Sequence, residues 1–237
     1  MIVSANQPYF CPFPGFFAKA SLSDVLIILD EVQFPQGTTW LSRNRFKNDQ
    51  GELWLTVPVW KKGLGLQAIN QVNICREGRW PRKHLASLKI AYGNAPYLEE
   101  HVPFLYKMFS SEFTRLADLN VAVIRYLMAC FRIDTKVVLQ SELGVTAKGT
   151  RLLLELCRNL QATTFLTLAP AKKYLESDLF VQAGIELRPF TYVAPTYPQL
   201  WGDFLANLSA FDLVLNCGPK ARDIVLRHQP EARLGKK

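Results

Sequence analysis

The chain opens with a short apolar run that ends in two amides. Ile2 and Val3 begin a run typical of a buried strand, and Asn6 and Gln7 follow it directly. A short helix is predicted over 15–20, and a second apolar strand over 25–29 leads to Asp30. Polar side chains at the carboxyl end of a buried strand lie where open α/β sheets bind ligands. The opening pattern therefore predicts a small-molecule site at the first strand-to-helix turn.

The hydrophobic pattern then changes to a period of two. Apolar residues alternate with polar ones over 53–59, and the turn signal Asp49-Gln50-Gly51 separates this segment from 40–47. This pattern predicts a β-hairpin inserted over 40–60. A further strand is predicted over 68–74.

The middle of the chain has the apolar spacing of helices. Pro81 is expected to open a helix through about Tyr92, and Pro103 to open another. A wide apolar stripe predicts a third helix over 113–131. We therefore expect a helical segment over 80–131.

Strands and helices alternate in the second half of the chain. Strands are predicted over 136–139, 163–168 and 185–190, with helices over 150–160 and 172–183 between them. This alternation predicts an α/β fold with a mainly parallel, Rossmann-like sheet and helices on both sides. No linker divides the chain, so we expect a single domain over 1–237.

The carboxyl-terminal region has clear helix boundaries. Ser209 is a good N-cap for a helix through Asn216, and Gly218 is a natural residue to end it. Pro219 is then expected to begin a last helix.

Composition narrows the class of protein. The chain has 237 residues, of which 49% are hydrophobic and 20% charged, and its formal net charge is +8. The positive charge favours an anionic partner such as a phosphate, a nucleotide, a nucleic acid or a membrane surface, although a basic surface can also serve solubility alone. No apolar run approaches the roughly 18 residues of a membrane-spanning helix, so we expect a cytoplasmic protein without a membrane span.

Cysteine and histidine give little support for metal or nucleophile chemistry. The five cysteines are widely spaced without a CxxC pair, which argues against disulfides and a zinc site. Of the three histidines, His84 could shuttle a proton or serve only structure, and neither His101 nor His228 has a neighbour that would make a metal pair. We therefore predict no metal site, and the pattern assigns no cofactor.

The first group of candidate residues surrounds the first turn. Asn6 and Gln7 can donate and accept hydrogen bonds, Tyr9 follows them, and Lys19 supplies a positive charge in the next helix. We expect this group to bind a substrate that is anionic or carries phosphate. The alternative is that the amides only satisfy backbone groups in a tight turn.

The second group begins where the second strand ends. Asp30 can take a proton or bind a hydroxyl group, and Gln33 follows it. Arg43 and Arg45 could clamp a phosphate or carboxylate, with Asn44 between them. In the alternative interpretation, Asp30 is a cap and the arginines form a solvated face of the hairpin.

The third group lies near the carboxyl terminus. Tyr197 and Gln199 precede a helix on which Asp212 and Asn216, four residues apart, share one face. These residues could line a pocket, or the pair could form an ordinary solvent-facing stripe. We expect all three groups to converge on one cavity.

Five segments together resemble the WbqC-like family of bacterial proteins, which is associated with polysaccharide biosynthesis. They are NQPYFCPFPGFFAKA, ILDEVQF, WLSRNRFKNDQGELWLTVPV, WPRKHLASLKIAYGNAPY and YPQLWGDFLANLSAFDLVLNCGP. The family's opening motif usually reads His-Gln-Pro, whereas Asn6 stands here, and a histidine commonly precedes its Tyr-Pro-Gln, where this chain has Ala194 or its neighbours. The resemblance implies an α/β architecture and strengthens nine of the candidates: Gln7, Tyr9, Asp30, Gln33, Asn44, Tyr197, Gln199, Asp212 and Asn216.

Two hypotheses for function follow. The first is a transferase in surface-polysaccharide or related metabolite biosynthesis, acting on a nucleotide- or carrier-activated small substrate, with Asp30, Gln7 and Asn6 as catalytic residues. The alternative is a non-catalytic module that binds a nucleotide or sugar nucleotide. Nucleic-acid binding rests on the net charge alone, for instance if a tRNA-linked molecule were the donor.

Overall fold

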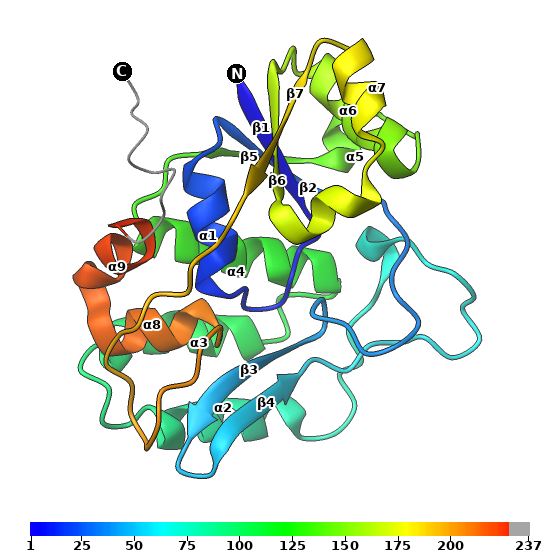
Figure 1. Cartoon of the computed structure of the whole chain (residues 1–237). Coiled ribbons are helices and arrows are strands. Elements are labelled where there is room, and N and C mark those ends of the chain that lie inside the picture. Colours follow the sequence, from blue (N-terminus) through cyan, green and yellow to red (C-terminus); the bar gives the residue numbers. More distant parts are fainter. Residues whose placement is uncertain (228–237) are drawn as a thin grey trace.

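A five-stranded parallel sheet forms the centre of the molecule. The computed structural model describes residues 1–227, and Figure 1 shows the sheet with helices on both faces. The strand order is β5-β2-β1-β6-β7, and each neighbouring pair is parallel. The strands are β1 (Ile2–Asn6), β2 (Val25–Ile28), β5 (Lys136–Leu139), β6 (Thr164–Leu168) and β7 (Glu186–Phe190). The predicted α/β, Rossmann-like fold is therefore confirmed.

Successive side chains of the strands supply two separate hydrophobic layers. In β2, Leu26 and Ile28 belong to one layer, whereas Val25 and Ile27 belong to the other. Helices α1 (Pro14–Ser21) and α4 (Leu116–Cys130) pack in the first layer, and α6 (Gly149–Asn159) and α7 (Ser177–Gln182) in the second. Burial on both faces explains why the strands are nearly continuous apolar runs.

The order of the strands reverses direction beside β1. From β1 the chain builds outward through β2 to β5, and it then crosses to β6 on the other side of β1. The connections from the carboxyl ends of β1 and β6 consequently run in opposite directions, and in open α/β sheets ligands bind at such a point.

The long connection between β2 and β5 contains the predicted hairpin and helical segment. The hairpin is β3 (Arg43–Asn48) and β4 (Gly51–Thr56), with Arg45 paired to Trp54. Helices α2 (Trp80–Ala91), α3 (Leu98–Phe109) and α4 follow it. Among residues 1–227, no helix is long and apolar enough to cross a membrane.

The predicted strand over 68–74 is wrong. This segment is a 3-10 turn, η1 (Ile69–Gln71), flanked by isolated bridges such as that between Val59 and Ile74. Ile69 and Val72, three residues apart, are both buried, and three residues make one turn of a 3-10 helix. The spacing of Ile69 and Val72 is therefore that of a 3-10 turn and not that of a strand.

Two helix starts in the middle of the chain also differ from the prediction. Helix α3 begins at Leu98, so Pro103 lies inside it on the exposed side. Buried Leu98 and His101 extend the apolar side of α3 by one turn before the proline. Helix α4 begins at Leu116 because the preceding Arg115 is held in a bridge with Asn73.

The predicted helix over 172–183 is two elements. Pro170 lies near the start of the 3-10 helix η2 (Ala169–Tyr174), an extended Leu175 follows, and α7 begins at Ser177. A proline suits the first turn of such a helix because its missing N–H has no partner there.

The carboxyl-terminal helices match the prediction closely. Ser209 caps α8 (Ala210–Cys217) by accepting a hydrogen bond from the Phe211 N–H. Gly218 then adopts a φ of +50°, and η3 (Gly218–Lys220) leads into α9 (Ala221–Arg227). The short helix α5 (Gln140–Leu143) completes the elements between β5 and α6. His228 lies outside the described residues.

Candidate functional site

A buried lysine lies beside the carboxyl end of the central strand β1. Lys19, in α1, is only 2% exposed, and its Nζ donates to Asn6 Oδ1 at 2.8 Å and to the Ala5 carbonyl at 2.9 Å. Within residues 1–227 it forms no ion pair with a carboxylate. Burial without a counter-charge lowers the pKa of the Lys19 amine to about 7.

This lysine fixes the orientation of the Asn6 amide. Because Oδ1 accepts from Lys19, the two N–H groups of Asn6 Nδ2 are left for another acceptor. In the part of the chain that the structure describes, neither Asn6 Nδ2 nor the Gln7 side chain is bonded to protein. The turn itself uses the Gln7 backbone carbonyl, which accepts from Tyr9 N at 2.9 Å. Two amide groups are thus available at the carboxyl end of β1.

The loop after β1 is held against the hairpin by buried amides. Asn44 Nδ2 donates to the carbonyls of Phe10 and Cys11, at 2.9 and 2.7 Å. Asn120 Nδ2, in α4, bridges the carbonyls of Pro8 and Leu41, each at 2.8 Å. Asn44, a predicted substrate ligand, therefore uses its amide N–H groups to shape the site.

Tyr9 lies partly buried in this loop. Its ring packs at a tilt against Phe16 of α1, with 6.3 Å between the ring centroids. Burial raises the pKa of the Tyr9 hydroxyl, so the hydroxyl stays protonated near neutral pH and can donate a hydrogen bond.

Asp30 connects the ends of two neighbouring strands. It follows β2, and its carboxylate accepts from Ser141 of α5, with Oδ1 bonded to the backbone N–H at 3.0 Å and Oδ2 to the hydroxyl at 2.6 Å. Asp30 is buried at the same edge of the sheet as Asn6, and it holds the first turn of α5. Gln33 is exposed, and its backbone forms a bridge with Ala68.

The two arginines lie on the outer side of the hairpin. Arg45 pairs with Glu52 across the strands and also donates to the carbonyls of Ala206 and Asn207, each at 3.3 Å. The Arg43 guanidinium instead stacks on the Trp54 ring, 3.7 Å from its centroid. Arg45 is therefore engaged in joining the hairpin to the 206–207 segment, whereas Arg43 is bonded to no acceptor among the described residues.

The third predicted group forms a buried cluster with Tyr92 and Lys47. The Tyr92 hydroxyl donates to Asp212 Oδ2 at 2.8 Å, and it accepts from the Lys47 backbone N–H at 3.0 Å. Lys47 Nζ reaches Gln199 Oε1 at 3.2 Å. Asp212 is fully buried, and desolvation raises the pKa of its carboxyl, while the hydrogen bond from Tyr92 opposes that rise.

Two members of the third group are placed differently. The Tyr197 hydroxyl is buried beside Asp212 and Gln199 of this cluster. Asn216 Nδ2 donates to the Asp212 backbone carbonyl at 2.8 Å, so its amide serves the helix. The cluster fastens the 197–209 segment to the hairpin.

The key polar side chain of each predicted group has a different partner. Asn6 is bonded through Lys19, Asp30 through Ser141, and Asp212 through Tyr92. No side-chain hydrogen bond among the described residues joins Asn6, Asp30 and Asp212 to one another, so a cavity common to all three groups stays a prediction. Within the same residues, no group of three histidine, cysteine or acidic side chains is placed to hold a metal ion.

Sequence reasoning missed the residues that support the site from a distance. Lys47, Asn120 and Ser141 act on residues far away in the chain. Asn120 did carry a signal, because a buried amide interrupts the apolar stripe of α4. A buried amide within such a stripe indicates a hydrogen-bond partner outside the helix.

Comparison with known proteins places these features in a family. A family model described as "WbqC-like protein family" matches residues 7–224. The protein named "Uncharacterized protein Rv1507c" from Mycobacterium tuberculosis (strain ATCC 25618 / H37Rv) is 30% identical over 224 residues, which cover 93% of this chain and 96% of that protein. No solved structure matches the chain.

Proposed function

The chain belongs to the WbqC-like protein family, and we propose that it is a transferase in bacterial surface-polysaccharide or related metabolite biosynthesis. It binds a nucleotide- or carrier-activated small substrate at the carboxyl ends of β1 and β6. The observation that carries this proposal is the pair of available amides, Asn6 and Gln7, beside the buried amine of Lys19. Such an activated substrate is made in the cytoplasm, where we propose that the protein acts.

The amides suit an anionic leaving group. Asn6 Nδ2 presents N–H donors because Lys19 occupies the other end of the amide. An arriving phosphate would favour the charged form of Lys19, since an opposite charge nearby raises the pKa of an amine. Oriented donors and a nearby positive charge are sufficient for transfer reactions that depend on positioning and on stabilising developing negative charge.

Asp30 takes the role of hydroxyl ligand or base in this proposal. Ser141 uses one acceptor position on each carboxylate oxygen. An ionised carboxylate has about four such positions, so a substrate hydroxyl can still donate to Asp30. Tyr9 and Gln33 would contact the substrate from the neighbouring loops.

Thermal shift measurements with nucleotides, nucleotide sugars and aminoacyl donors test binding, because a ligand of the folded state raises Tm by mass action. Mass spectrometry of the ligands that bind then tests for a transfer product.

Gln7→Ala is expected to lower kcat/KM by about a hundredfold if Gln7 stabilises the transition state. Gln50→Ala, in the exposed hairpin turn, is the matched control and should leave turnover unchanged. Unchanged turnover in both Gln7→Ala and Asp30→Asn would contradict the assignment.

A non-catalytic binding module is the second candidate. It is favoured by Asn6, which stands where the family's opening motif usually has a histidine and which cannot carry a proton. Saturable binding without any product in the mass spectrometer would establish this alternative. Affinity for RNA that falls steeply with salt would instead indicate a tRNA-linked donor.

A further inference from the structure

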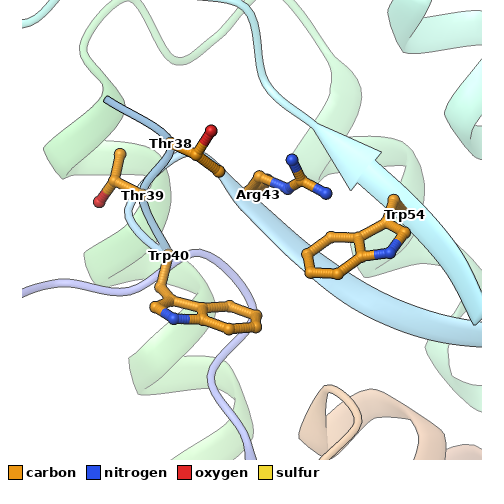
Figure 2. Close-up of a pocket in the computed structure, with 5 residues that line it drawn as sticks. All are labelled: Thr38, Thr39, Trp40, Arg43 and Trp54. Carbon is orange, nitrogen blue, oxygen red and sulfur yellow. The ribbon is translucent and has the colours of Figure 1, made fainter. Parts of the chain in front are cut away.

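The outer side of the hairpin contains a hollow that none of the groups above explains. Figure 2 shows that it is lined by Thr38, Thr39, Trp40, Arg43 and Trp54, and its volume is about 130 Å³. Because Arg45 pairs with Trp54 across the hairpin, Arg43 lies diagonally from Trp54 on the same side of the two strands.

Two tryptophans give the hollow an apolar surface that is open to solvent. Trp40 and Trp54 are 46% and 38% exposed, and their ring centroids lie 5.6 Å apart with an angle of 30° between the planes. Tryptophan is a residue on which binding energy concentrates. An adjacent exposed pair therefore indicates a surface that binds a ligand with an apolar face.

Arg43 adds a positive charge that has no acceptor. Its guanidinium stacks on Trp54, and its Nε is buried without a hydrogen-bond partner among the described residues. A buried N–H without a partner is costly, and an arginine pairs most strongly with a carboxylate or a phosphate. The positive charge, which meets no acceptor among the described residues, favours an anionic group at the edge of the hollow.

We infer that this hollow binds a pyranose ring that carries a carboxylate or a phosphate. The ring would lie against the indoles with its C–H groups, and the anionic group would accept from Arg43. A cavity of about 150 Å³ holds one benzene ring, so a hollow of this size suits a single six-membered ring.

The geometry disfavours a nucleobase. Two rings 5.6 Å apart leave no room for a third ring between them. The C–H face of a sugar ring can instead lie against the outer surface of the indoles, and a guanidinium matches an acid.

The hollow adjoins the proposed transferase site. The Trp40 carbonyl accepts from Phe10 N at 2.9 Å, so the hollow abuts the loop that leaves β1. The inference that the hollow is a subsite for the sugar part of the donor or acceptor rests on the proposed function. Binding at the hollow can nevertheless be measured without turnover.

Titration calorimetry with glucuronate and glucose 6-phosphate tests the inference, with glucose, acetate, inorganic phosphate and uridine monophosphate as comparisons. We expect the two acidic sugars to bind at least about tenfold more tightly than glucose or either simple anion. Trp40→Ala and Arg43→Gln should each weaken that binding by about tenfold or more. Trp60→Ala is the matched control, since Trp60 is 44% exposed and lies outside the lining of the hollow.

The outcomes separate this inference from the proposed function. Equal affinity for glucose, equal affinity for the simple anions, preference for uridine monophosphate, or no saturable binding would each overturn it. So would unchanged affinity in Trp40→Ala and Arg43→Gln. Acidic-sugar binding that these variants abolish, in a protein without any transfer activity, would support the inference and refute the transferase.

Discussion

Lys19 is an unusual residue because its amine is buried beside neutral oxygens only. Burial lowers its pKa from 10.5 to about 7. The unfolded chain therefore binds one more proton than the folded chain at pH values between these two. Folding stability must rise with pH across that interval, and the stability cost of the buried charge is fully present below it.

Lys19→Met is expected to remove this rise. The difference in free energy of unfolding between wild type and variant should change by several kcal/mol, at about 1.4 kcal/mol for each pKa unit, as the pH increases from about 7 to 10.5. Urea unfolding at a series of pH values measures it. Lys62→Met, at an exposed lysine, is the control and should leave the pH profile unchanged. If the free energy of unfolding of Lys19→Met changed with pH in parallel with that of wild type, the buried amine would not titrate in this range.

Gly218 combines two constraints in one residue. Its φ is +50°, and a Cβ atom there would overlap the Tyr97 ring. Gly144 has a similar φ of +65° but open space around it. Gly218→Ala should therefore cost more stability than the roughly 1–3 kcal/mol typical of backbone strain alone. Gly144→Ala should cost less, because Gly144 has ordinary left-handed geometry, with a ψ of 25° instead of −126°, and open space around it. Equal losses in thermal unfolding would contradict this.

Some candidate residues stand out in the sequence, but their hydrogen-bond partners lie far away in the chain and could not be predicted. Asn6 and Gln7 stand out because they end an apolar run, and the structure leaves their amides available. The partner of Asp30 could not be identified, because Ser141 lies 111 residues away. Only the pairing of β2 with β5 brings these two residues together.

The hairpin is joined to the loop after β1 through the Asn44 side chain. Asn44→Ala would leave the carbonyls of Phe10 and Cys11 without these donors, at a cost of about 1–3 kcal/mol for each buried group left unpaired. We expect faster hydrogen exchange over residues 8–11, with smaller changes in the central sheet.

Asn48→Ala provides the control for this prediction. Asn48 lies at the other end of β3, where its Oδ1 accepts from Gln50 N in the turn. Its loss should affect only the turn. Equal exchange over residues 8–11 in both variants would show that Asn44 does not hold the loop.

The elements most easily predicted were those with a long, regular pattern. Strands β1, β2 and β6 were identified because each is mainly apolar, whereas the edge strand β7 also carries Glu186 and Arg188. The 68–74 segment was predicted as a strand but is a 3-10 turn, because buried residues three positions apart also occur in irregular strands. Pro103 misled because a proline is normally a first-turn residue, whereas here it lies on the exposed side of α3.

We propose that the whole chain is one domain, with the hairpin and the helical segment as parts of it. One hydrophobic cluster includes Leu26 of the sheet, Phe46 of the hairpin and Leu105 of the helical segment. A shared core predicts a single cooperative unfolding transition. Far-ultraviolet circular dichroism and tryptophan fluorescence should therefore give coincident urea curves. Earlier loss of tryptophan fluorescence would indicate that the hairpin region unfolds independently.

Alternation of strands and helices was enough to predict a parallel sheet, but not the order of its strands. That order depends on which apolar faces pack together in three dimensions. It matters here because placing β1 between β2 and β6 puts the Asn6 and Gln7 amides at the point where the strand order reverses.

A crystal structure with the nucleotide sugar that raises Tm most would test the central claim directly. We predict that its phosphate oxygens lie within hydrogen-bond distance of Asn6 Nδ2 and the Gln7 amide, at the carboxyl ends of β1 and β6. A fully occupied ligand bound elsewhere, with both amides left unbonded, would contradict the account.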